Sequence, residues 1–260
     1  MRILFLILFV SILLSCEGSS NQRIKTDLQP RQEIVSSKKF DEQSWQYFLQ
    51  HLPLTSGPVL DYKGKPVSYQ EKHFAIVNYD VGRTDLQQCA DALMRLRAEY
   101  LFRQQRYSEI GFHFVSGQYY SWDDYCKGLK VSPEGNNIKI IQALSCSRTH
   151  ETLRKYLDIV YTYASTISLA KELKKKNIFE VGTVVIFPGS PGHCFIIIDE
   201  ATDNSGKKVF KLVEGYSPEQ SIYVLRNIDE ESISPWYHLS KGIIRTASFE
   251  FTDYKLGGFE

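Results

Sequence analysis

Hydrophobic residues between positions 84 and 107 recur at intervals of three and four, the spacing that places side chains on one face of an α-helix. These residues are Leu86, Cys89, Ala90, Leu93, Leu96 and Tyr100. Asp85 stands three residues before Gln88, a spacing that resembles a capping box with Asp in place of Ser or Thr. The pattern therefore predicts a helix over 84–107 that begins near Asp85 and buries one apolar stripe.

A second helical pattern covers residues 149–175 and ends in a cluster of lysines at 171 and 174–176. Positive side chains at this end suit the negative end of a helix dipole, so these lysines need no other partner to explain them. Shorter patterns predict a helix over 41–52 and a strand over 73–81.

The C-terminal part of the chain carries short apolar runs that are typical of strands. They cover residues 182–187, 194–199, 208–215 and 221–227, and the loop between the second and third contains the Asn, Ser and Gly of a hairpin. Helices followed by a meander of antiparallel strands favour an α+β fold over a parallel doubly wound sheet.

The first fifteen residues carry one early positive charge, Arg2, and then an apolar run that is typical of a secretory signal. The run ends in Leu-Leu-Ser-Cys at 13–16, which resembles the lipobox of bacterial lipoproteins and implies cleavage before Cys16 and acylation of that residue. The alternative is an ordinary signal peptide whose cysteine is coincidental. We therefore predict a signal peptide over 1–15, a polar lipidated tether over 16–40, and one globular domain over 41–260. The expected location is the cell membrane or the outer membrane, outside the cytoplasm.

Composition narrows the possible partners. The net charge is +1 and hydrophobic residues make up 43% of the chain, which favours neither a nucleic-acid-binding protein nor a disordered one. Four cysteines remain besides Cys16, and in an exported protein they are compatible with free thiols or with disulfides among Cys89, Cys126, Cys146 and Cys194. Because no cysteine or histidine cluster has zinc-ligand spacing, we expect no metal and no cofactor.

A titratable histidine stands at the start of a predicted strand in the segment GSPGHCFIIID, residues 189–199. His193 follows a Pro-Gly turn and is therefore a candidate general base, or else a turn histidine with a satisfied ring. Cys194 points to the opposite face of the strand, since side chains alternate, and is predicted to lie in the core.

The longer segment VGTVVIFPGSPGHCFIII resembles a part of papain-like cysteine hydrolases of the NlpC and CHAP kind, which cut peptide or amide bonds in bacterial cell walls. The sequence departs from their pattern at Thr183, where those enzymes usually have Asp. The resemblance implies N-terminal helices followed by an antiparallel sheet or half-barrel. It also implies a nucleophilic cysteine near the start of a helix that precedes the histidine in the chain.

Cys89 is the cysteine that fits this position. A helix N-terminus and a nearby imidazolium both favour the thiolate, which is the attacking species. Against this role, Cys89 lies on the apolar stripe and about four residues past the predicted cap, so an inert buried thiol explains it as well. Its neighbours also lack the Asp-Cys-Ser-Gly motif usual in NlpC enzymes.

Other residues complete the candidate site. Glu214 ends the apolar strand after the histidine, where CHAP-type enzymes place the group that orients the ring; the alternative is an exposed strand end. Gln88 offers an amide to an oxyanion or caps the helix. Tyr216 and Gln220 are candidates for the wall of a pocket.

Several segments together resemble an uncharacterised lipoprotein family, a domain of unknown function of Bacteroidota-like bacteria. The resemblance covers roughly residues 45–255, and its segments are QQCADALMRLRAEYLFRQQRYSEIGFHFVSG, YLDIVYTYASTISLAKEL, GSPGHCFIIID and SPWYHL. It implies an exported, lipid-anchored protein and brings no established activity.

Three hypotheses for the function follow. The first is a lipid-anchored cysteine hydrolase acting on peptide or amide bonds such as those of peptidoglycan. The second is a non-catalytic binding or scaffold lipoprotein of the cell envelope that uses surface aromatic residues such as Trp122. The third is an acyl- or amide-transferring enzyme with the same three residues.

Overall fold

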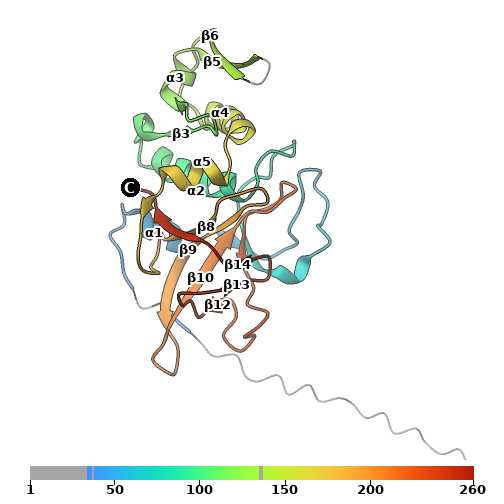
Figure 1. Cartoon of the computed structure of the whole chain (residues 1–260), viewed down its shortest axis with the longest axis vertical. Helices are drawn as coiled ribbons and strands as arrows, with labels where there is room; N and C mark the ends of the chain where they lie inside the picture. Colours follow the sequence, from blue (N-terminus) through green and yellow to red (C-terminus); the bar gives the residue numbers. More distant parts are fainter. Residues whose placement is uncertain (1–33, 37, 135–136) are drawn as a thin grey trace, which may run out of the picture. The chain divides into compact units, whose positions relative to one another are not determined.

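The computed structural model describes residues 34–36, 38–134 and 137–260. The architecture is α+β, as predicted, and is built on a sheet of antiparallel pairs (Figure 1). Within these residues the strand order along the sheet is β1-β2-β11-β10-β9-β8-β15-β7, and β12 also pairs with β10. The strands are β1 (Leu54–Thr55), β2 (His73–Val77), β7 (Lys174–Lys175), β8 (Val184–Phe187), β9 (His193–Thr202), β10 (Lys208–Glu214), β11 (Tyr223–Leu225), β12 (Trp236–Tyr237) and β15 (Lys255–Gly258).

The predicted meander is present in β8 to β11, which pair in sequence order. Two strands, β1 and β2, precede the long helix and extend the sheet beyond β11. Three short hairpins lie apart from it: β3 (Gly111–His113) with β4 (Tyr119–Ser121), β5 (Leu129–Glu134) with β6 (Asn137–Gln142), and β13 (Ile244–Arg245) with β14 (Glu250–Phe251).

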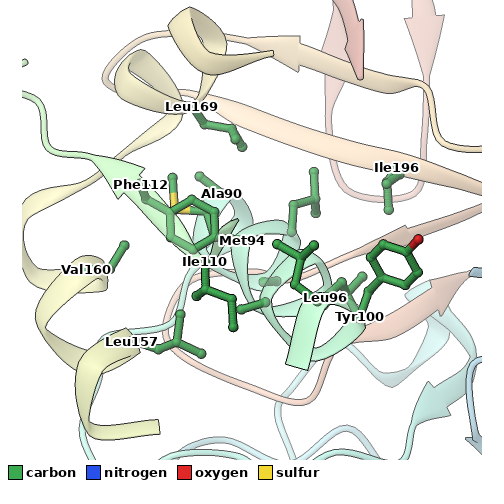
Figure 2. Packing of buried hydrophobic residues seen from close by; sticks show 14 of the residues in the cluster. Ala90, Met94, Leu96, Tyr100, Ile110, Phe112, Leu157, Val160, Leu169 and Ile196 are labelled. Carbon is green, nitrogen blue, oxygen red and sulfur yellow. The ribbon is translucent and has the colours of Figure 1, made fainter. Parts of the chain in front are cut away.

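The helices pack against the sheet or against one another. They are α1 (Trp45–Gln50), α2 (Cys89–Arg103), α3 (Trp122–Cys126), α4 (His150–Tyr163) and α5 (Thr166–Glu172), with short 3-10 turns η1 (Gln70–Lys72) and η2 (Tyr107–Glu109). Both α1 and α2 pack on β9, and α4 and α5 pack on α2. Figure 2 shows the resulting core, in which Leu157 and Val160 of α4 and Leu169 of α5 surround Met94 of α2.

The central strand β9 is buried on both faces. Cys194, Ile196 and Ile198 belong to the core beneath the helices. Phe195 and Ile197 belong to a second core on the other face of the sheet. The alternation predicted for Cys194 is therefore correct, because consecutive side chains of a strand leave on opposite faces.

The pattern over 149–175 forms two helices and a strand instead of one helix. Ala164 has extended backbone, and the Ser165 hydroxyl accepts from the Ile167 N–H and so caps a new helix. Lys174 and Lys175 then pair with Gly258 and Gly257 at the edge of the sheet. The helix-dipole interpretation of those two lysines was wrong, because backbone pairing overrides the local pattern.

Trp122 is fully buried, so its interpretation as a surface aromatic was also wrong. Its ring packs against Phe102 and Tyr107, whereas Tyr119 three residues earlier remains 48% exposed. The four cysteines outside the N-terminal segment are free, with the sulfurs of Cys126 and Cys146 3.5 Å apart.

The predicted signal peptide and Cys16 lie outside the described residues. The described end of the predicted tether contacts the domain: Lys38 forms an ion pair with Glu200, and its carbonyl accepts a hydrogen bond from Gln50. Among the residues that the structure describes, no helix is both long and apolar enough to span a membrane.

Candidate active site

Cys89 is the first residue of α2, with Gln88 as the N-cap. The backbone N–H of Gln88 donates to Asp91 Oδ2 over 3.0 Å, so the acidic half of a capping box lies at Asp91. The helix therefore begins four residues later than the sequence pattern predicts. This removes the objection that Cys89 lies too deep in the helix to feel the positive end of its dipole.

The later start has a physical cause in Glu219, a buried carboxylate from the loop after β10. Its oxygens accept hydrogen bonds from the N–H groups of Gly82, Leu86 and Gln87, over 2.6, 3.0 and 2.8 Å. Asp85, the predicted cap, accepts instead from the Glu219 N–H over 2.7 Å. These contacts hold residues 82–87 as a loop and deliver Cys89 to the first turn of the helix.

His193 and Glu214 meet at the same end of two neighbouring strands. His193 begins β9 and Glu214 ends the antiparallel β10, and His193 Nε2 lies 2.8 Å from Glu214 Oε2. The carboxylate is fully buried and the imidazole is 4% exposed. The alternative of an exposed glutamate at a strand end is therefore excluded by its burial.

The second oxygen of Glu214 is held as firmly as the first. Oε1 accepts hydrogen bonds from the hydroxyls of Tyr223 and Ser248. The ring of His193 packs against Tyr216, Phe249 and Phe251, with centroid separations between 5.2 and 5.8 Å. A buried charge needs such partners, and together they fix the ring in one orientation.

The sulfur of Cys89 lies at the point where α2 reaches this end of the sheet. It donates a hydrogen bond to the carbonyl oxygen of Gly192 over 3.8 Å, and it lies close enough to the His193 ring and the Cys194 thiol for both to shift its pKa. Because Nε2 of the ring faces Glu214, Nδ1 is the nitrogen that remains for Cys89. Cys89 is intermediate in exposure as a residue, whereas His193 and Cys194 are buried.

Close approach of the helix to β10 depends on Gly215. A Cβ atom at this position would lie about 3.0 Å from the Gln88 carbonyl oxygen and still closer to the Ala92 side chain. Only glycine leaves room for the first turn of α2 beside the end of the strand. Gly215 thus allows the Cys89 thiol at the start of α2 to approach the Glu214 carboxylate at the end of β10.

The electrostatics favour a thiolate–imidazolium pair. The hydrogen bond from Cys194 and the charge and hydrogen bond of His193 lower the pKa of the Cys89 thiol well below its usual value, against the effect of burial. Burial by itself lowers the pKa of His193, but hydrogen bonds to Cys89 and Glu214 outweigh it and raise that pKa to about 10. The Ala90 N–H also hydrogen-bonds the sulfur, as expected at a helix N-terminus.

These shifts predict the pH dependence of alkylation. A lowered pKa keeps Cys89 ionised until the pH falls below that value, and His193 loses its proton only as the pH rises through about 10. The iodoacetamide rate at Cys89 should therefore change less than about twofold between pH 7 and 9, where an ordinary thiol gains roughly 25-fold. Site-resolved mass spectrometry measures both rates.

Cys126 supplies the internal comparison, because burial raises its pKa to about 12 and its alkylation should still be increasing at pH 9. A Cys89 rate that rises in parallel with that of Cys126 would contradict the ion pair.

The predicted accessory residues fall into two groups. Gln88 is the N-cap residue of α2 with an exposed side chain, and its backbone N–H makes the capping contact, with Asp91. Tyr216 and Gln220 both line a cavity of about 250 Å³ beside the site. Tyr223 lines the same cavity and holds Glu214, so the cavity wall and the buried carboxylate are continuous.

Sequence patterns missed four contributors to the site: Cys194 as a neighbour of the thiol, Glu219 as the anchor of the helix start, and Tyr223 and Ser248 as partners of Glu214. Tyr223 and Cys194 lie in predicted strands, but no local pattern indicates what their side chains touch. Ser248 and Glu219 come from loops distant in sequence from Cys89.

The fold and site define an α+β protein with a cysteine–histidine–glutamate triad at the junction of a helix N-terminus and a sheet. Within the described residues, no group of histidine, cysteine and acidic side chains is arranged to hold a metal ion. The chain belongs to the family described as domain of unknown function (4846), whose match covers residues 24–257. Neither the curated proteins nor the solved structures contain a match to this chain.

Proposed function

We propose that this protein is a lipid-anchored cysteine hydrolase of the cell envelope, with a papain-like arrangement that cuts peptide or amide bonds. The observation that carries the proposal is the contact of a half-buried thiol at a helix N-terminus with a buried imidazole, itself hydrogen-bonded to a buried glutamate. A structural core cysteine does not need such charged partners.

The chemistry follows from these positions. The Cys89 sulfur attacks the substrate carbonyl carbon, and the carbonyl oxygen becomes an oxyanion near the first N–H groups of α2. His193 gives its proton to the leaving amine as the C–N bond breaks, which leaves an acyl group on Cys89. His193 then takes a proton from water, whose oxygen attacks the thioester and releases the acid and the thiolate.

Glu214 keeps the imidazole oriented and stabilises its positive charge. Tyr223 and Ser248 neutralise part of the carboxylate charge by donating to its second oxygen. The carboxylate therefore remains an acceptor throughout the reaction and does not need to take up the proton.

The location rests on the sequence. A charged, apolar leader that ends in Cys16 supports export and acylation, and a lipid on that residue would hold the domain at the cell membrane or outer membrane. We propose peptidoglycan peptides as the substrate because peptidoglycan lies in the cell envelope, next to a lipid-anchored domain. We expect no cofactor, since thiolate, imidazolium and water suffice for amide hydrolysis.

Detection of the acyl-enzyme tests this function. The full chain is mixed with purified peptidoglycan peptides, quenched with acid, and digested for mass spectrometry. We expect a substrate-derived mass on the peptide that contains Cys89, together with new amino termini in the substrate. The variant Glu214→Gln should still bind but accumulate less than about one tenth of the adduct.

The competing function is non-catalytic binding. It predicts retention of peptidoglycan with no adduct and no new amino termini, and that combination would refute hydrolysis of these peptides. Transfer to an amine other than water would give the adduct but a different product. Adding an amino-acid ester and searching for the transferred product distinguishes this third hypothesis.

A further inference from the structure

Lys72 stands beside the triad with no acceptor for its ammonium group. It ends the η1 turn and lines the 250 Å³ cavity that also contains Tyr216 and Tyr223. Its Nζ lies 4.6 Å from the ring centroid of Tyr69 and 5.0 Å from that of Tyr216. In the part of the chain that the structure describes, Lys72 Nζ makes no ion pair and no hydrogen bond.

Cation–π contact explains the position of the ammonium group but not its hydrogen-bonding capacity. Two tyrosine faces stabilise the positive charge, and its three N–H donors remain available to a ligand in the cavity or to water. The comparison with Lys63 makes the difference clear: it lies over Tyr62 in the same way but is solvent-exposed, so water satisfies it.

Tyr216 connects this cation to the reacting atoms. Its ring lies 5.0 Å from Lys72 Nζ on one side and packs edge-on against the His193 ring, at 5.5 Å, on the other. Burial raises the pKa of the Tyr216 hydroxyl, and the negative charges of Glu214 and Cys89 raise it further. The ring of Tyr216 therefore lies between a ligand in the cavity and His193 of the triad.

The cavity is formed before any ligand binds. The side-chain amide of Gln70 bonds the N–H and carbonyl groups of Val59 and the carbonyl of Val67, which ties two sides of the rim together. The carbonyl of Lys72 accepts from the Arg226 N–H over 2.8 Å. The backbone that carries the ammonium group is thus fixed, and binding needs little reordering.

The cavity also contains a carboxylate, Asp61, but its charge is already engaged. Its Oδ1 atom accepts hydrogen bonds from the N–H groups of Lys63 and Lys65, over 2.8 and 2.9 Å, and closes a turn. Asp61 keeps its negative charge but is held in this turn, whereas Lys72 Nζ has no ion-pair partner among the described residues, so Lys72 is the group of the cavity that can pair with an anion.

From this arrangement we infer that the cavity is a subsite for a carboxylate of the substrate peptide, held by Lys72 Nζ between the two tyrosine rings. The inference rests on the proposed function, because it assigns the substrate class of the same site. The substrate would be a peptide with an acidic side chain or a free C-terminal carboxylate close to the bond that is cut.

Alkylation of Cys89 by matched peptide probes tests the subsite without knowledge of the natural substrate. One pair is chloroacetyl-Ala-Ala with a free carboxylate and the same compound as its C-terminal amide. The other is chloroacetyl-Ala-Glu-amide and chloroacetyl-Ala-Gln-amide. The measured quantity is the ratio of anionic to neutral rates in each pair, at fixed pH and low salt.

We expect one pair to show a ratio that falls about tenfold in Lys72→Met, which keeps the aliphatic stem but removes the charge. Lys72→Arg should retain most of the ratio. The matched control Lys63→Met removes an equivalent lysine–tyrosine contact outside the cavity and should leave the ratio unchanged. The pair that responds tells a side-chain carboxylate from a terminal one.

Two results separate the failure of this inference from the failure of the function. A ratio unaffected by Lys72→Met, with rapid reaction of the neutral probes at Cys89, overturns the carboxylate subsite and leaves the hydrolase proposal standing. Neutral probes that react at Cys89 no faster than at Cys146 overturn both. An equal fall in Lys63→Met would show a general charge effect and also reject the subsite.

Discussion

Replacing Cys89 by alanine should lower amide hydrolysis by at least about 10³-fold while the domain remains folded. The reason is that no other group described in the site can form the acyl intermediate: Cys194 touches Cys89 but is fully buried, and burial together with its hydrogen bond to Cys89 raises its pKa well above the usual value. The measurement is the rate of release of new amino termini from purified peptidoglycan peptides, alongside thermal unfolding. Cys89→Ser should be nearly as inactive, because a hydroxyl does not ionise where a thiol does.

The matched control is Cys146→Ser, which removes a second half-buried thiol that lies against Cys126 and outside the triad. This variant should keep at least half of the wild-type hydrolysis rate. If purified Cys89→Ala retains the wild-type rate, the thiol is not the nucleophile and the hydrolase proposal is wrong.

Replacing Glu219 by alanine should lower the free energy of unfolding by about 3 kcal/mol or more. Three backbone N–H groups, those of Gly82, Leu86 and Gln87, would lose their acceptor in a place where the side chain is only 2% exposed. Chemical denaturation measures the change. The same variant should slow Cys89 alkylation at pH 7, because the loop that sets the start of α2 is released.

Two further variants bracket this result. Gly82→Ala should act in the same direction, since a Cβ atom at this position would overlap the Glu219 carboxylate. Glu180→Gln breaks a half-exposed ion pair with Lys176 and should cost no more than about 0.5 kcal/mol. A loss in Glu219→Ala as small as that of Glu180→Gln would show that Glu219 does not anchor the segment before the helix.

Local pattern was sufficient for much of the fold. Short apolar runs predicted β8 to β11 and their order, and a three- and four-residue spacing predicted the body of α2. It failed at the boundaries. The start of α2 moved from Asp85 to Cys89 because a carboxylate from residue 219 engages the preceding N–H groups, which no window of neighbouring residues contains.

The sequence also predicted the candidate triad only in part. Residue type and chain order suggested Cys89, His193 and Glu214, and the structure brings the three together. The tyrosine and serine that hold Glu214 could not be inferred, since hydroxyls at positions 223 and 248 have no distinctive spacing. Trp122 was misjudged as a surface residue because aromatic residues serve cores and binding faces equally well.

By itself, the sequence determined the α+β class and the meander of strands, and it suggested three candidate side chains for the site, because each depends on residue type and on periodicity along the chain. Only the tertiary structure decided where α2 begins, that Cys194 lies next to the thiol, and that Lys72 lines a cavity together with Tyr216, whose ring packs on His193. These features depend on contacts between residues more than fifty positions apart, whose geometry is set by packing and buried hydrogen bonds.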